Sequence, residues 1–164
     1  MTDLSSDFIN KLFENAQKDS SLLDTININE IISMSENDNT DYINKKTMND
    51  ILNSVYEGLT ELPINEIKRN ELYNKLAGYR IIENIYEIHK GKHIRWIRYN
   101  TPDKITNGAI VAEIKFYNNG THVLCKTIHN KIFQIKYDEC LIFQKLSVGE
   151  QLILMAYEYA ISKK

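Results

Sequence analysis

The chain has 164 residues, of which 43% are hydrophobic and 26% are charged, and its formal net charge is −2. These values are typical of one folded domain, or one domain with an appendage, and exclude a wholly disordered chain, a collagen-like repeat and a disulfide-stapled miniprotein. No run approaches the roughly 20 apolar residues that a membrane-spanning helix needs. We therefore expect no membrane association.

The residue choice is skewed, with 24 Ile but only 4 Val and 16 Lys but only 4 Arg. Ile, Asn and Lys have A/T-rich codons, so the bias indicates an AT-rich genome and reduces the weight of the many lysines. The charge is uneven, at −7 over residues 1–60 and +5 over residues 61–164. The positive part can face an anionic partner, or it can be a solvated surface.

Two cysteines, Cys125 and Cys140, are too few for a disulfide scaffold and form no CxxC pair. We expect two reduced, buried thiols, no metal and no cofactor. The N-terminus, Met1-Thr2-Asp3-Leu4, has neither the basic start nor the apolar core of a signal peptide. This predicts an intracellular protein that is not secreted.

The first predicted element is an amphipathic helix over the first 18 residues. Because a polar segment near residues 33–44 follows it and is expected to be mobile, the helix can dock in a partner's groove. The alternative is that it packs on its own chain. The apolar stripe that would dock comprises Leu4, Phe8, Leu12 and Phe13.

Two more helices are predicted over residues 45–58 and from Ile64 to about Gly78, which makes residues 1–78 a helical N-terminal region. Six strands are then expected, over residues 81–88, 93–99, 110–117, 121–128, 131–137 and 141–146. Lys90-Gly91-Lys92 is interpreted as the turn of a first hairpin, and Asn118-Asn119-Gly120 is the strongest turn signal.

A final helix over residues 147–162 begins with Ser147 and Glu150 in the spacing of a capping box. Helices followed by strands indicate an α+β fold. Short strands of this number often close into a barrel, because closure removes exposed edges. Residues 79–164 are thus predicted to be a small β-barrel with a C-terminal capping helix.

The order of features over residues 92–146 resembles the SH3-like barrels, including Tudor-type domains. The strand from His93 to Arg98 is followed by a longer loop, a meander and the tight link Asp138-Glu139-Cys140 before the last strand. A Tudor-type domain implies an aromatic cage that receives a methylated Lys or Arg side chain. The candidates for this cage are Tyr99, Tyr117, Phe133 and Tyr137.

The residue choice is also similar to that of uncharacterised proteins of large DNA viruses with AT-rich genomes. The favoured function is a non-catalytic binding or structural module that contacts another protein, as a component of a viral particle or assembly. Its expected location is then the host cytoplasm or the virion.

Catalysis is not expected. The histidines His89, His93, His122 and His129 lack the spacing of a zinc site. No GxSxG, HExxH, Walker or GxGxxG pattern is present.

The alternative function is a nucleic-acid-binding barrel. Basic residues interleaved with aromatic ones suit phosphate contact combined with base stacking. The predicted first hairpin supplies such a strip in Lys90, Lys92, Arg95, Trp96, Arg98 and Tyr99. The alternative is that Trp96, which shares a strand face with Ile94, belongs to the core.

Overall fold

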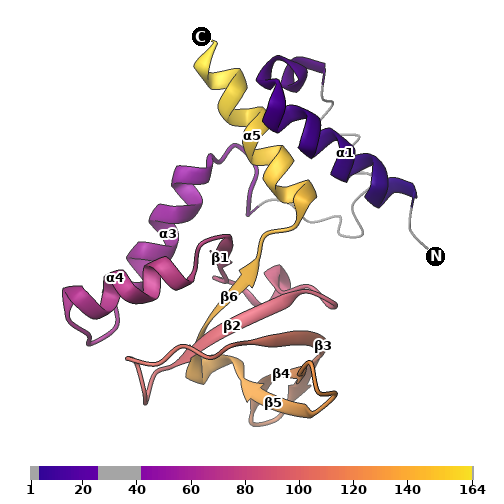
Figure 1. The fold of residues 1–164 in the computed structure, drawn as a ribbon. Helices are drawn as coiled ribbons and strands as arrows, with labels where there is room; N and C mark the ends of the chain where they lie inside the picture. The colour runs from indigo at the N-terminus through magenta and orange to yellow at the C-terminus, as the bar shows by residue number, and fades with distance from the viewer. Residues whose placement is uncertain (1–3, 26–41, 164) are drawn as a thin grey trace. The chain divides into compact units, whose positions relative to one another are not determined.

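The computed structural model describes residues 4–25 and 42–163 (Figure 1). These residues form two compact units, which draw on residues 1–51 with 146–164 and on residues 52–145. We call them unit 1 and unit 2. Most of the polar segment predicted near residues 33–44 lies outside the described residues. The domain boundary predicted at residue 78 falls inside unit 2, while the C-terminal helix belongs to unit 1.

Unit 1 contains the two predicted terminal helices, α1 (Leu4–Lys18) and α5 (Val148–Ser162), and the 3₁₀-helix η1 (Ser20–Thr25). α1 and α5 lie side by side (Figure 1) and share an apolar core that includes Ala16 and Leu152. The predicted capping box of α5 is confirmed. The Ser147 hydroxyl accepts the Glu150 N–H at 3.1 Å, and the Glu150 carboxylate accepts the Ser147 N–H at 2.8 Å.

Unit 2 combines helices with a six-stranded antiparallel sheet, which confirms an α+β fold. The helices are α3 (Met48–Thr60), which begins in unit 1, and α4 (Glu66–Lys75). Two single 3₁₀ turns, η2 (Ile85–Glu87) and η3 (Tyr137–Glu139), precede β2 and β6. The strands are β1 (Tyr79–Ile81), β2 (His93–Arg98), β3 (Ala109–Tyr117), β4 (Gly120–Lys126), β5 (Ile132–Lys136) and β6 (Cys140–Lys145).

The strands pair in the order β1-β6-β2-β3-β4-β5 (Figure 1). β3, β4 and β5 form the predicted meander, and the turn between β3 and β4 is Asn118-Asn119. Its positive φ of 123° falls on Gly120, where the missing Cβ makes that angle accessible. The edge strands β1 and β5 are not paired with each other in the described residues, so closure of the barrel remains a prediction.

The central strands β2 and β6 are buried on both faces. Alternate side chains such as Ile94, Trp96 and Ile142 enter one core, which the meander completes with Val111, Val123 and Ile135. The side chains between them, Ile97 and Phe143, enter a second core with the apolar faces of α3 and α4. This second core explains why the two helices belong with the sheet rather than with an N-terminal helical region.

The first predicted hairpin was wrong. Residues 81–88 do not form one strand that pairs with β2: only Ile81 belongs to β1, and residues 85–87 form η2. β1 and β2 are instead both neighbours of β6. The intervening segment turns its apolar residues inward, where Ile82 and Ile88 enter the same core as Trp96.

Candidate functional site

Two of the predicted cage residues, Tyr99 and Tyr137, lie at the same end of the sheet. Tyr99 directly follows β2, and its N–H donates to the carbonyl oxygen of Glu139 at 3.1 Å. Glu139 and Tyr137 belong to η3, the single turn that leads into β6. Because β2 and β6 are antiparallel neighbours, the end of β2 meets the beginning of β6. The antiparallel pairing of β2 with β6 thus brings these two residues to one end of the sheet.

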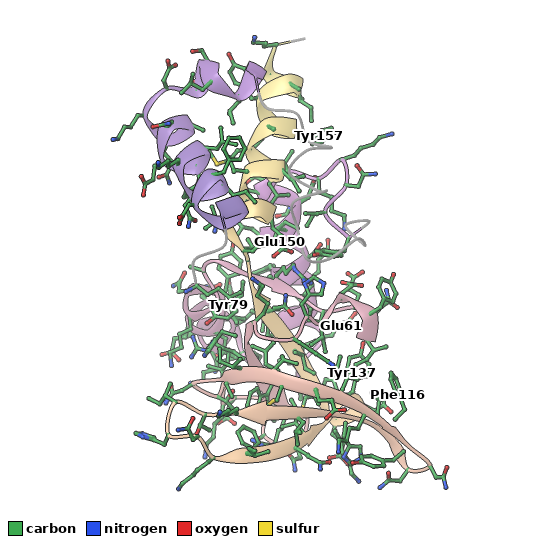
Figure 2. All side chains as sticks on the ribbon, turned by 90° about the vertical axis from the view of Figure 1, so that its right-hand side faces the viewer. Glu61, Tyr79, Phe116, Tyr137, Glu150 and Tyr157 are labelled. Atoms are coloured by element: carbon green, nitrogen blue, oxygen red, sulfur yellow. The ribbon has the colours of Figure 1, made fainter. Side chains whose placement is uncertain are left out.

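The environment of these two tyrosines is acidic. The pKa of Tyr137 is raised, first by burial and then by the negative charges of Glu87, Asp138 and ionised Tyr99. The pKa of Tyr99 is raised by burial, and further by Cys140, Glu61 and Asp138. The two rings are therefore within electrostatic reach of each other and of Asp138. Figure 2 shows Glu61 and Tyr137 on the same side of unit 2.

We call Tyr99, Tyr137, Glu61 and Asp138 the tyrosine–carboxylate cluster. Tyr99 is 50% exposed, whereas Tyr137 is half-buried and donates its hydroxyl to the Glu83 carbonyl oxygen at 3.2 Å. Glu61 and Asp138 are exposed and make no ion pair in the part of the chain that the structure describes. The cluster therefore offers one fixed ring, one accessible ring and two unpaired carboxylates.

Two cations also lie at this end of the sheet. Lys136 is 3.8 Å from the Glu139 carboxylate, and both side chains are exposed. Arg98 lies close enough to Cys140 to counteract part of the rise that burial causes in the pKa of that thiol. Neither cation pairs with Glu61 or Asp138, so these two carboxylates are available to a cationic ligand.

The other two cage candidates do not join the cluster. Phe133 packs against the core, with its ring centroid 5.5 Å from that of Trp96. Tyr117 makes an edge-on contact with His122, at 5.0 Å between ring centroids. Asp138 and Glu61 were missed as cage residues. Asp138 is next to Tyr137 in sequence, and this proximity could have identified it as a member of the site. Glu61 directly follows α3, so it reaches the cluster only because α3 packs on the sheet.

The predicted basic and aromatic strip is divided by the fold. Trp96 is only 2% exposed and lies in the core. Arg95 is half-buried, and its guanidinium donates to two carbonyl oxygens, those of Thr106 at 2.9 Å and Lys75 at 2.7 Å. Strand alternation separates Arg95 from Arg98. The exposed members of the strip are Lys90, Lys92, Arg98 and Tyr99.

The predicted docking stripe is only partly accessible. Leu12 and Phe13 pack against the core that α1 shares with α5, whereas Phe8 is 45% exposed. Leu4 begins the helix, but its side chain is not among those the structure describes. The described contacts therefore favour packing of the stripe within its own chain.

The histidines are held separately. His93 contacts the Tyr79 hydroxyl, His89 contacts the Gln144 amide, His122 contacts the Gln134 amide, and His129 is exposed. In the described residues, no three His, Cys, Asp or Glu side chains are grouped so that they could hold a metal ion. Cys125 and Cys140 are free and buried, and burial raises the pKa of Cys125 to about 12.

Searches of protein-family models, curated proteins and solved structures gave no match to this chain. Within the described residues, no helix is long and apolar enough to cross a membrane.

Proposed function

We propose that the chain is a protein-binding module whose tyrosine–carboxylate cluster receives a Lys or Arg side chain of a partner. The observation that carries this proposal is the 3.1 Å hydrogen bond from the Tyr99 N–H to the Glu139 carbonyl oxygen, which joins Tyr99 to the turn η3 that holds Tyr137 and Asp138. A tyrosine face attracts a cation through its quadrupole. Unpaired carboxylates add a charge interaction, which a neutral ligand would not gain.

The strand arrangement supports an SH3-like barrel as the scaffold. Five strands pair in the order β6-β2-β3-β4-β5, and the single turn η3 leads into the last strand. All five contribute side chains to one core. In such an arrangement, the loop after β2 and the turn before β6 are rigidly held at one end, as a binding site requires. The proposal includes closure of the barrel, in which the edge strand β5 meets the opposite side of the sheet.

The test is a calorimetric titration of the full chain with a lysine-rich peptide and with the same peptide carrying trimethyl-lysine. We expect Tyr99→Ala to weaken binding by about tenfold, the equivalent of a cation–π interaction of roughly 1.4 kcal/mol. Tyr117→Ala is the control for the loss of an exposed ring, because Tyr117 is similarly exposed, at 45% against 50%, and its ring packs on His122.

The carboxylates provide a second arm of the test. Glu61→Gln and Asp138→Asn keep the size of each side chain and remove its charge, so each variant is expected to weaken binding and its dependence on salt. Equal affinities for the Tyr99→Ala and Tyr117→Ala variants would reject the cluster as the binding site. A role in a viral particle would follow only from the identity of the partner.

A further inference from the structure

The outer face of the meander formed by β3, β4 and β5 is rich in lysine, and neither the core nor the proposed function explains these lysines. Strand alternation directs these residues away from the core that contains Val123 and Ile135. α3 and α4 pack on the part of the sheet formed by β1, β6 and β2, and not on this part. We call this surface the lysine face, and its defining residues are Lys115, Tyr117, His122, Leu124, Lys126 and Lys136.

Two lysines flank a histidine in one row across the lysine face. The strand register places Lys115 opposite His122, and His122 opposite Lys136. Adjacent strands are about 4.8 Å apart, so the two lysines stand about 10 Å apart on either side of the imidazole. Lys126 lies farther along β4 on the same face.

Few negative charges offset these lysines. Glu113 lies opposite Leu124 on the same face and makes no ion pair within the described residues. Lys136 meets Glu139 at 3.8 Å, with side chains that are 47% and 68% exposed. An ion pair this long and this exposed contributes little. On the strands themselves the face thus carries three lysines, Lys115, Lys126 and Lys136, against one carboxylate, Glu113, while Asp138 and Glu139 lie at its edge in η3.

An aromatic ring is held at the end of this row. Tyr117 is 45% exposed, and its ring contacts His122 edge-on, with an angle of 85° between the two planes. His122 is fixed in turn by a 3.0 Å contact between its Nδ1 and the Gln134 side-chain oxygen. The exposed ring is thus oriented before any ligand arrives, which reduces the entropy lost on binding.

We propose that the lysine face binds single-stranded nucleic acid, with phosphates on Lys115, Lys126 and Lys136 and a base stacked on Tyr117. Lysines spaced over neighbouring strands can follow a phosphate backbone, and an exposed ring can stack only on an unpaired base. This surface differs from the strip predicted at residues 90–99, in which Trp96 is buried. It adjoins the tyrosine–carboxylate cluster at Asp138, whose carboxylate lies near Gly120, the residue opposite Tyr117, so phosphates are placed on the lysines and not at that edge.

The test measures fluorescence anisotropy of a labelled single strand of about 12 nucleotides, a length within the range of sites on small barrels. The same strand in a duplex is the second probe. The double variant Lys115→Glu, Lys136→Glu is compared with Lys90→Glu, Lys92→Glu, which reverses the same number of charges in the predicted strip. Circular dichroism and thermal unfolding verify that both variants fold, and Lys115→Gln, Lys136→Gln replaces the first if it does not.

We expect the lysine-face variant to weaken single-strand binding at least about tenfold and to reduce the slope of log affinity against log salt by about 1.4, or 0.7 for each phosphate that is no longer neutralised. The strip variant should leave both nearly unchanged. Tyr117→Ala should weaken binding without changing the salt slope, because stacking releases no counterions. Tyr99→Ala should have no effect on this binding, which separates this test from that of the proposed function.

Three results would overturn the proposal. The first is an absence of binding at low salt. The second is a loss of affinity in the strip variant with none in the lysine-face variant, which would return the site to Lys90 and Lys92. The third is a preference for the duplex together with no effect of Tyr117→Ala, which would remove the role of stacking.

Discussion

The Tyr79 hydroxyl lies 2.8 Å from Nδ1 of His93, although the two residues are on strands that do not pair with each other. β6 runs between these strands, and its last residue, Lys145, lies opposite Tyr79. The contact therefore spans β6 and fixes the position of the short strand β1. It also places an imidazole ring beside two cations, Lys145 and Arg95, which oppose its protonation.

This contact predicts a pH dependence of stability. The pKa of His93 is lowered, first by burial and then by the charges of Lys145 and Arg95. The unfolded chain, with a histidine pKa near the ordinary value of 6.5, therefore binds more protons than the folded chain once the pH falls below that value. Stability that is present above this pH is lost as the pH falls towards the pKa of the folded state.

The measurement is urea unfolding between about pH 5 and pH 8, the range around the ordinary histidine pKa. His93→Gln should flatten the decline in the free energy of unfolding on the acidic side, because the amide does not titrate. His129→Gln is the control, since that ring is exposed. If both variants keep the slope of the parent chain, His93 does not contribute to the pH dependence.

Gly108 is predicted to be intolerant of any side chain, for two separable reasons. Its φ is +91°, a region that costs an L-residue about 1–2 kcal/mol. A Cβ atom there would also overlap with the carbonyl oxygen of Ile94 and the ring of His93. Gly108→Ala should therefore lower the free energy of unfolding by more than the conformational cost alone.

Gly78→Ala is the matched control for this prediction. The φ of Gly78 is +84°, but no heavy atom lies within 4 Å of a Cβ added there. Its loss of stability should report the conformational cost, and the difference between the two variants should report the overlap. If urea unfolding gives the same loss in the free energy of unfolding for both variants, β2 has shifted to make room for the added methyl group.

Several parts of this fold could be predicted from local sequence. The capping box at Ser147 and the turn before Gly120 depend on residues within a few positions of each other, and both are present in the structure. The apolar alternation of the meander predicts its strands to within a few residues. These features need no knowledge of the rest of the chain.

Long-range pairing could not be predicted in the same way. β1 pairs with β6 from Tyr79 to Lys145, and nothing near Tyr79 in the sequence specifies that partner. The segment around Ile85 has the composition of a strand, but it is used to cover the core. Trp96 allowed two predictions, since the flanking arginines suggest a surface strip and the strand face shared with Ile94 suggests the core, and the structure shows the core. Only two of four cage candidates converge, because convergence depends on the tertiary fold.

The environment of Trp96 can be tested directly, since the chain has only one tryptophan. Its side chain is 2% exposed and packs on Phe133. We expect emission at short wavelength and little quenching by acrylamide in the folded protein, with full quenching in urea. Addition of a single-stranded oligonucleotide should leave the emission unchanged, because no base can reach the indole. Quenching by the oligonucleotide would place the nucleic-acid site on β2 after all.

The two cysteines are predicted to be unreactive in the folded chain. Burial, together with a smaller effect of the negative charge of Cys140, raises the pKa of Cys125 to about 12. The pKa of Cys140 is also raised by burial, against the opposing effect of Arg98. Since the thiolate is the reactive species, both groups should react slowly with Ellman's reagent at neutral pH.

Unfolding should expose both thiols at once, so the reagent should titrate both cysteines of the chain in urea. Cys140→Ser leaves Cys125 alone and assigns each rate. Cys125, which is completely buried, should react only as fast as its surroundings open, whereas Cys140, at 7% exposure beside the tyrosine–carboxylate cluster, should react first.

If a lysine-rich peptide slows the reaction of Cys140 and not that of Cys125, the peptide binds at that end of the sheet. If Cys140 reacts as fast in the folded chain as in urea, the beginning of β6 is not packed against the core.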